Sequence, residues 1–207
     1  KKINEAKRPL LESGNAIEGI NTVVPRELLE HNIERAIKKM FGSKVAYTLI
    51  GNTRKDFLGD VDVAIDKAEL MQLFKIKEPK ELADAVAKHI EQKVSEATAR
   101  SFKGLQMVSV MLPLVDKQNK QLSAFDRITN KQIPGVPGMF QIDLMIGNVN
   151  YLRKSMSGAG EGSKYKALYR NAFLMEIFAH VSWKDKNNPK IRYKLDAGTK
   201  EGVRLVK

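Results

Sequence analysis

The stretch from residue 48 to residue 66 constrains the fold most, because it joins two apolar runs through a polar turn and carries two closely spaced acids. Its sequence is TLIGNTRKDFLGDVDVAID. Val61, Val63 and Ile65 alternate with polar or small residues, which is typical of a β-strand with one buried face. Residues two apart on a strand point the same way, so Asp60 and Asp62 are predicted side by side on one surface.

The two acids and the turn before them predict a site for a metal and a phosphate group. Neighbouring carboxylates repel each other unless a cation lies between them, and Mg²⁺ often bridges carboxylates to substrate phosphates. Gly51 lets backbone N–H groups approach an anion. Asn52, Arg54 and Lys55 add donors and positive charge. The alternative is a surface hairpin whose acids are only solvated.

A third acid, Asp143, interrupts an apolar, strand-like run over residues 139–147. A charged residue in such a run is costly if it is buried without a partner, so it must face solvent, a partner or a metal. Together with Asp60 and Asp62 it would complete a two-metal site of the kind that supports in-line phosphoryl displacement.

The order of these motifs resembles that of the nucleotidyltransferase superfamily. Gly51-Asn52 comes first, the Asp60-x-Asp62 pair follows, and the strand with Asp143 comes later. Its members include DNA polymerase beta, poly(A) polymerases, CCA-adding enzymes and small antibiotic or protein nucleotidyltransferases. The resemblance covers about residues 25–150, and Asn52 stands where the family usually has Ser or Gly. It implies transfer of a nucleoside monophosphate from an NTP or dNTP to an acceptor hydroxyl, with release of pyrophosphate.

The resemblance also implies roles for the residues of this motif. Asp60, Asp62 and Asp143 would hold two Mg²⁺ or Mn²⁺ ions, and Asp143 would help to deprotonate the acceptor hydroxyl. The β- and γ-phosphates would be held at the turn, with the residues Gly51, Asn52 and either Arg54 or Lys55.

A second phosphate contact is expected after the third acid, where the family often has a helix that contributes Ser, Lys or Tyr to the triphosphate. In this sequence a glycine-rich stretch, residues 157–163, leads into a predicted helix over residues 164–181. Ser163, Lys164 and Tyr165 stand at its start, where free N–H groups and the helix dipole favour an anion. The glycines lack a known phosphate-binding spacing, so a flexible linker is the alternative.

The charge balance favours a polyanionic partner. The chain has 36 Lys and Arg against 24 Asp and Glu, a net charge of +12, and clustered basic residues release counterions from nucleic acids. A solvated basic surface is the alternative. The long polar segment over residues 116–138 is predicted to be a loop that contacts RNA or DNA, or else a plain solvated loop. Its basic residues are Lys117, Lys120, Arg127 and Lys131.

The absence of cysteine from the sequence excludes disulfides and thiolate metal sites, and it fits a reducing compartment, so a cytoplasmic location is expected. No apolar run approaches the length of a membrane span. No membrane partner is therefore expected.

The predicted fold is of the α/β (α+β) class, a small mixed sheet with helices on one side, followed by a helical C-terminal part and a terminal β-hairpin. Helices are predicted over residues 25–40, 79–99, 148–156 and 164–181, and strands over 45–50, 61–65, 107–115 and 139–147. Residues 191–206 are predicted to form the hairpin, which we interpret as a capping ribbon. The domain hypothesis is an N-terminal arm (1–24), a catalytic domain (25–150) and a C-terminal extension (151–207).

Three other functions are compatible with the sequence. The chain would instead modify a protein or a small molecule, or bind nucleic acid without catalysis, or use its acids to hold a stabilising ion. The net charge argues against a small-molecule enzyme, and three intact acids argue against a site that has lost its chemistry.

Overall fold

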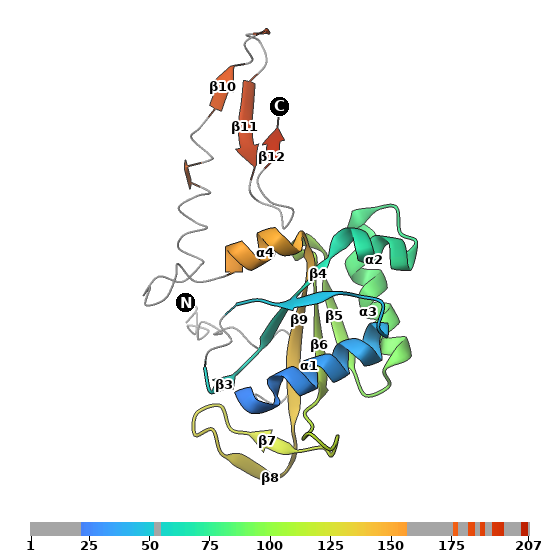
Figure 1. Cartoon of the computed structure of the whole chain (residues 1–207), viewed down its shortest axis with the longest axis vertical. Helices are drawn as coiled ribbons and strands as arrows, with labels where there is room; N and C mark the ends of the chain where they lie inside the picture. The colour runs from blue at the N-terminus through green and yellow to red at the C-terminus, as the bar shows by residue number, and fades with distance from the viewer. Residues whose placement is uncertain are drawn as a thin grey trace, which may run out of the picture.

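The computed structural model describes residues 22–51, 55–156, 176–177, 182–184, 187–188, 192–196 and 204–206. Its centre is a five-stranded sheet in the order β2-β4-β9-β6-β5 (Figure 1). The strands are β2 (Tyr47–Leu49), β4 (Val61–Asp66), β5 (Thr98–Phe102), β6 (Met107–Pro113) and β9 (Met139–Gly147). β4 and β9 are parallel and the other pairs are antiparallel. The predicted fold class, a mixed sheet flanked by helices, is confirmed.

The main core lies between one face of this sheet and the helices α1 (Arg26–Phe41), α2 (Lys67–Phe74) and α3 (Leu82–Lys93). The apolar stripe of α1 repeats at helical spacing, so Ile33, Ile37 and Met40 are all buried. On β4 the alternating residues Val61 and Val63 enter the same core. Asp66 caps α2 by accepting hydrogen bonds from the backbone N–H groups of its first turn.

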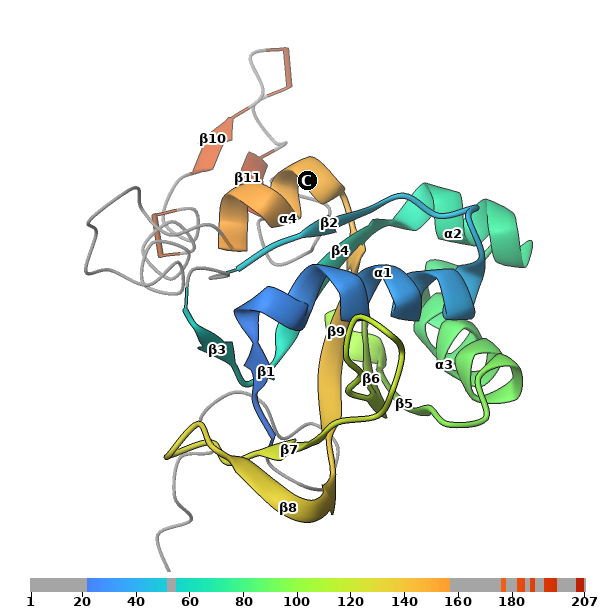
Figure 2. The same cartoon turned by 60° about the horizontal axis from the view of Figure 1, so that its bottom comes forward.

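A fourth helix, α4 (Val149–Met156), packs on the opposite face of the sheet. Leu152 is buried there with Ile50 and Ala64, and Met145 packs against them. Figure 2 shows α4 and α1 on opposite sides of β2 and β4. The prediction of helices on one side only was therefore wrong, because alternation along β4 and β9 gives this second face small and apolar residues that α4 covers. The predicted helix over residues 148–156 is confirmed.

The helix predicted over residues 79–99 is shorter than expected. Residues Pro79–Glu81 form a 3₁₀ turn, η1, and α3 ends at Lys93. Val94 is extended, with φ −123° and ψ 93°, and the chain then enters β5. Pairing of β5 with β6 in the sheet overrides the helical periodicity that Val94 and Ala97 continued. A second 3₁₀ turn, η2 (Lys103–Leu105), joins β5 to β6.

The segment 116–138 is a hairpin and not the long loop that was predicted. Its strands β7 (Ser123–Phe125) and β8 (Gln132–Pro137) form a two-stranded antiparallel sheet, which projects from the lower end of the central sheet in Figure 1. The prolines of β8 are compatible with a strand because β8 pairs on one side only, with β7, within the described chain.

A short ribbon ties this hairpin to the start of β4. β1 (Val24–Pro25) pairs with β3 (Phe57–Leu58), and Thr22 bridges Asp126 of the hairpin. The rings of Phe57 and Phe125 lie 6.0 Å apart. The hairpin is therefore held beside the segment that leads into the two acids.

The C-terminal strands β10 (Ser182–Lys184), β11 (Arg192–Asp196) and β12 (Arg204–Val206) form a three-stranded antiparallel sheet, and β11 and β12 confirm the predicted hairpin. Of the helix predicted over residues 164–181, only residues 176–177 are described, and they are helical. The proposed domain boundaries stay predictions. Within the described ranges, no helix has the length and apolar character needed to cross a membrane.

Candidate active site

Strand register brings Asp62 and Asp143 together from positions 81 residues apart in the sequence. Asp62 is the direct partner of Asp143 across the parallel pair β4·β9, and neighbouring strands lie about 4.8 Å apart. Ser109 is opposite Asp143 on β6, and Arg100 is opposite Ser109 on β5. These four polar residues form one row across the sheet, on the face away from the main core.

Asp143 is held in place by two buried donors. It is 8% exposed, and its Oδ1 accepts hydrogen bonds from Ser109 Oγ at 2.6 Å and from Gln141 Nε2 at 2.9 Å. Gln141 shares a face with Asp143 because it stands two residues earlier on β9. Both bonds end on Oδ1, so neither of these two donors occupies Oδ2, which is the atom that we expect to meet a ligand.

The predicted phosphate turn touches Asp62 directly. Gly51 has a positive φ of 78°, a conformation that favours glycine. A Cβ at this position would lie 2.9 Å from Asp62 Oδ2, so the backbone of Gly51 approaches the carboxylate more closely than another residue allows. Ile50 N also donates to the backbone oxygen of Asp62 at 3.0 Å.

Asp60 lies just before β4 and is half-buried. Burial raises the pKa of its carboxyl group, and the negative charge of Asp143 adds to that rise. Arg127, a backbone hydrogen bond and Lys55 oppose the rise. Asp60 and Asp143 are thus near enough to repel each other, and two basic side chains are near enough to offset that repulsion.

Arg127 comes from the turn between β7 and β8, yet it lies at the acids. Its Nη2 is 3.2 Å from the place that a Cβ on Gly59 would take, and Gly59 immediately precedes Asp60. The four basic residues predicted to contact nucleic acid do not form one cluster. Lys117 and Lys120 lie in the turn before β7, and Arg127 and Lys131 follow it, at the other end of that strand.

The structure therefore gathers part of the predicted site. Asp60, Asp62, Asp143, Gly51 and Lys55 belong to one region of the molecule. The remaining predicted phosphate contacts lie outside the described residues, namely Asn52, Arg54, Ser163, Lys164 and Tyr165.

Sequence reasoning did not assign three residues to this region, namely Ser109, Gln141 and Arg127, the last of which was predicted to contact nucleic acid instead. Ser109 is the one polar residue in the apolar run of β6. Gln141 stands two residues before Asp143, where a strand places it on the same face. The approach of Arg127 to Gly59 had no local signal, because it depends on how the hairpin folds back.

The chemistry of these donors fits Mg²⁺ or Mn²⁺. All three acids offer only oxygen ligands, and two of them stand on rigid, paired strands. Among the described residues no three acidic or histidine side chains already converge as a metal cage. Mg²⁺ does not need one, since it usually takes one or two carboxylates and completes its shell with substrate phosphates and water.

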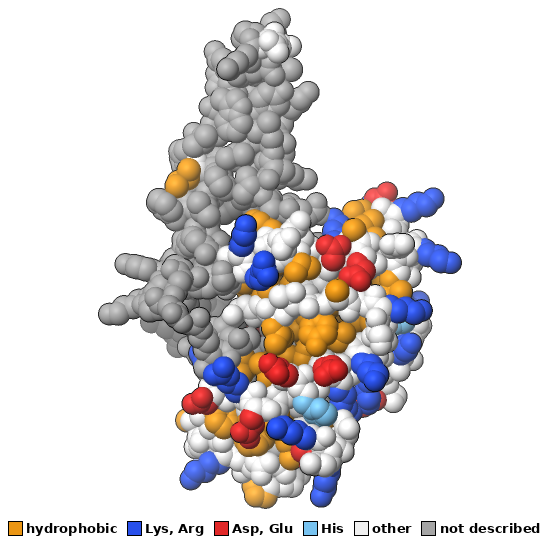
Figure 3. Space-filling view, viewed as in Figure 1, with side chains coloured by type: hydrophobic (Ala, Val, Ile, Leu, Met, Phe, Trp, Pro, Cys, Tyr) orange, Lys and Arg blue, Asp and Glu red, His pale blue; other side chains and the backbone are white. Residues whose placement is uncertain are grey.

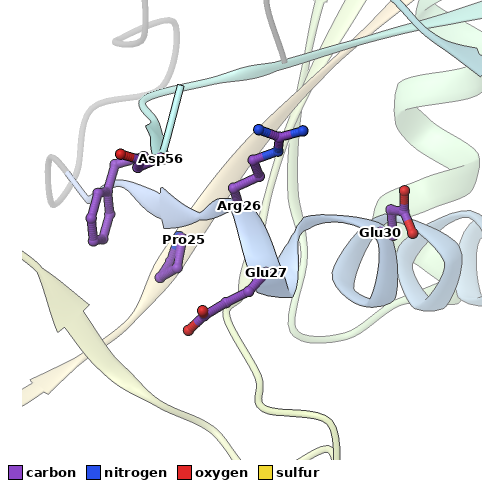
Figure 4. Close-up of a pocket in the computed structure, with 6 residues that line it drawn as sticks. Pro25, Arg26, Glu27, Glu30 and Asp56 are labelled. Carbon is purple, nitrogen blue, oxygen red and sulfur yellow. The ribbon is translucent and has the colours of Figure 1, made fainter. Parts of the chain in front are cut away.

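One pocket is lined by residues at the start of α1 and around β3. Figure 4 shows it at the start of α1, with Glu27 and Arg26 pointing in different directions. None of the predicted site residues lines this pocket. Its lining is Pro25, Arg26, Glu27, Glu30, Asp56 and Phe57.

The surface charge is mixed on the side of the molecule drawn in Figure 3. Basic side chains lie mainly around the rim of the described part, and acidic side chains lie among them and over its middle. On this side the net charge of +12 is not gathered into one basic patch.

No family model matches the sequence, and no curated protein matches it. Among solved structures, the chain is similar to Leishmania infantum polymerase beta in a ternary P/T complex, with 17% sequence identity and a TM-score of 0.42. The match covers 77% of this chain and 54% of the polymerase chain, so this chain spans about half the length of that protein.

Proposed function

We propose that this chain is a metal-dependent nucleotidyltransferase that transfers a nucleoside monophosphate from an NTP or dNTP to an acceptor hydroxyl. The acceptor that we propose is a nucleic acid. The observation that carries the proposal is the pairing of Asp62 with Asp143 on adjacent strands, with the Gly51 turn against Asp62. The order of these motifs in the sequence, which resembles the nucleotidyltransferase superfamily, adds to it.

Each residue of the site has a proposed task in this reaction. Asp60, Asp62 and Asp143 would hold two Mg²⁺ ions, which neutralise phosphate charge and favour the ionised acceptor hydroxyl. Asp143, fixed by Ser109 and Gln141, presents its second oxygen at one constant position. The backbone of the Gly51 turn would hold the leaving phosphates.

The proposed transfer balances as a displacement at the α-phosphorus. A bond forms between the acceptor oxygen and the α-phosphorus, and the bond from the α-phosphorus to the oxygen that bridges it to the β-phosphate breaks. The electron pair of that bond leaves with pyrophosphate. The hydroxyl proton departs toward Asp143 and then solvent.

Incubation of the protein with each α-labelled NTP and dNTP, Mg²⁺ or Mn²⁺, and a panel of RNA, DNA, protein and small-molecule acceptors tests the proposal. We expect label on a nucleic acid, and we expect Asp62→Asn to lose transfer because it removes a metal ligand without removing a core contact. Label on a protein or a small molecule would support the transfer reaction but contradict the nucleic-acid acceptor. Equal transfer by Asp62→Asn and the wild-type protein would rule out this site.

The nucleic-acid acceptor has its own test in the salt dependence of binding. If about five phosphates are contacted, the logarithm of affinity falls with the logarithm of salt concentration at a slope of about −3.5 to −4.5. Filter binding across a salt series measures this slope. Absence of RNA or DNA binding at low salt would remove the nucleic-acid acceptor and leave the protein or small-molecule alternative.

A further inference from the structure

The turn between β7 and β8 has a fixed conformation. Asp126 Oδ1 accepts hydrogen bonds from Ile128 N at 3.1 Å, Thr129 N at 2.6 Å and Thr129 Oγ1 at 2.8 Å. Asp126 N donates to Lys131 O at 2.8 Å, and Asn130 adopts the left-handed conformation at φ 57°. Side-chain capping of this kind defines a turn without help from its surroundings.

The same turn is attached to the segment that precedes the acids. Val23 N donates to Phe125 O at 3.3 Å, and the bridge between Thr22 and Asp126 continues this pairing. The contact between Phe57 and Phe125 adds an apolar attachment to β3. The turn that carries Arg127 is therefore attached both to the segment before α1 and to β3.

The Arg127 guanidinium lies against Gly59. Measured from the place a Cβ on Gly59 would occupy, Nη2 is at 3.2 Å, Cζ at 3.5 Å and Nε at 3.7 Å. The absence of a side chain at Gly59 is what leaves room for this approach. The positive charge of Arg127 also opposes the rise in the pKa of Asp60, as expected for a guanidinium beside the residue that precedes Asp60.

We infer that Arg127 is the internal counter-ion of the carboxylate site and that, once metal ions take over this role, it binds the phosphates of the incoming nucleotide. The inference rests on the proposed function. Three carboxylates without metal carry a charge of −3, which Arg127 and Lys55 partly offset. With two divalent ions the acids and metals sum to +1, and the two basic residues raise this to +3. That positive surplus favours binding of a triphosphate and offsets most of its negative charge.

The two roles give Arg127→Gln opposite effects on two binding constants. For Mg²⁺ alone, removal of a competing positive charge should tighten binding by about threefold to tenfold. For magnesium tripolyphosphate, loss of a hydrogen-bonded charged contact should weaken binding by about tenfold to a hundredfold. Isothermal titration calorimetry of the full chain with each probe measures both constants.

Two further variants keep the experiment interpretable. Lys93→Gln removes one exposed positive charge at the end of α3 and should change neither constant. Gly59→Ala adds a Cβ that displaces the flexible guanidinium by a few tenths of an ångström, and it should shift both constants in the same directions by smaller factors. Thermal melts establish that each variant is folded.

The outcomes separate the inference from the proposed function. A wild-type protein that binds neither Mg²⁺ nor magnesium tripolyphosphate would overturn the proposed function, and the role of Arg127 with it. Suppose that the wild-type protein binds both probes and that the Arg127→Gln variant is folded. If its affinities for Mg²⁺ and for magnesium tripolyphosphate are both unchanged or both weakened, the inference alone is overturned. If Arg127→Gln is unfolded, Gly59→Ala decides by the same criterion.

Discussion

Replacement of Ser109 by alanine tests how Asp143 is held. The 2.6 Å bond from Ser109 Oγ to Asp143 Oδ1 joins a fully buried hydroxyl to a carboxylate that is 8% exposed. Hydrogen bonds to charged groups contribute about 1.5–3 kcal/mol, and serine and alanine differ by one oxygen atom. We therefore expect the free energy of unfolding to fall by about 1.5–3 kcal/mol, or the melting temperature by roughly 3–12 °C.

Urea unfolding of Ser109→Ala, measured alone and in an Asp143→Asn background, is the assay. With a neutral partner the same bond is worth only about 0.5–1.5 kcal/mol, so the double-mutant cycle should give a coupling energy of about 1 kcal/mol. Ser101→Ala is the matched control. It removes a hydroxyl that donates at 2.5 Å to Asp84, an exposed carboxylate, and its cost should be smaller because solvent replaces the bond.

Two results would refute this reasoning. A loss below about 0.5 kcal/mol would mean that the buried bond contributes no more than a surface contact does. An equal loss in the wild-type and Asp143→Asn backgrounds would mean that Ser109 stabilises the sheet by packing and not through the carboxylate.

Three other changes have defined outcomes. Gly51→Ala should cost more stability than Gly42→Ala in thermal melts, because both positions have positive φ but only Gly51 has a neighbour, a carboxylate oxygen 2.9 Å from the added Cβ. Asp143→Ala should lower turnover more than Mg-NTP affinity, as measured by kinetics and calorimetry, and equal losses would make Asp143 a ligand of the nucleotide metal or a structural residue. Glu96→Gln should lower stability by up to about 1 kcal/mol at neutral pH. The Lys39 hydrogen bond lowers the pKa of Glu96, so this stability is present above the unfolded-state pKa and lost as pH falls through the folded-state pKa, and the two proteins should converge in acid melts.

The sequence was most informative where local pattern and tertiary pairing agree. The stripe of α1 and the alternation of β4 predicted both elements to within one residue at either end. In the same way, the sequence placed Gly51 near the paired acids, and in the structure Gly51 lies against Asp62.

What the sequence could not provide depends on contacts distant in the chain. The end of α3 is set by pairing of β5 with β6, although Val94 continues its apolar stripe. The segment of β7 and β8 was predicted to be a loop because its prolines and polar residues are not typical of strands. Its turns are stabilised by Asp116 and Asp126, whose side chains accept hydrogen bonds from backbone N–H groups. The contact of Arg127 with Gly59 depends on that hairpin, so the sequence could not predict this contact either.

The central claim is that Asp62 on β4 and Asp143 on β9 hold metal ions beside a bound nucleoside triphosphate. Anomalous diffraction from crystals grown with Mn²⁺ and a non-hydrolysable nucleotide tests it most directly. The account predicts a manganese peak in contact with both Asp62 and Asp143, with the triphosphate beside Gly51. A bound nucleotide whose manganese lies away from these two carboxylates would contradict it.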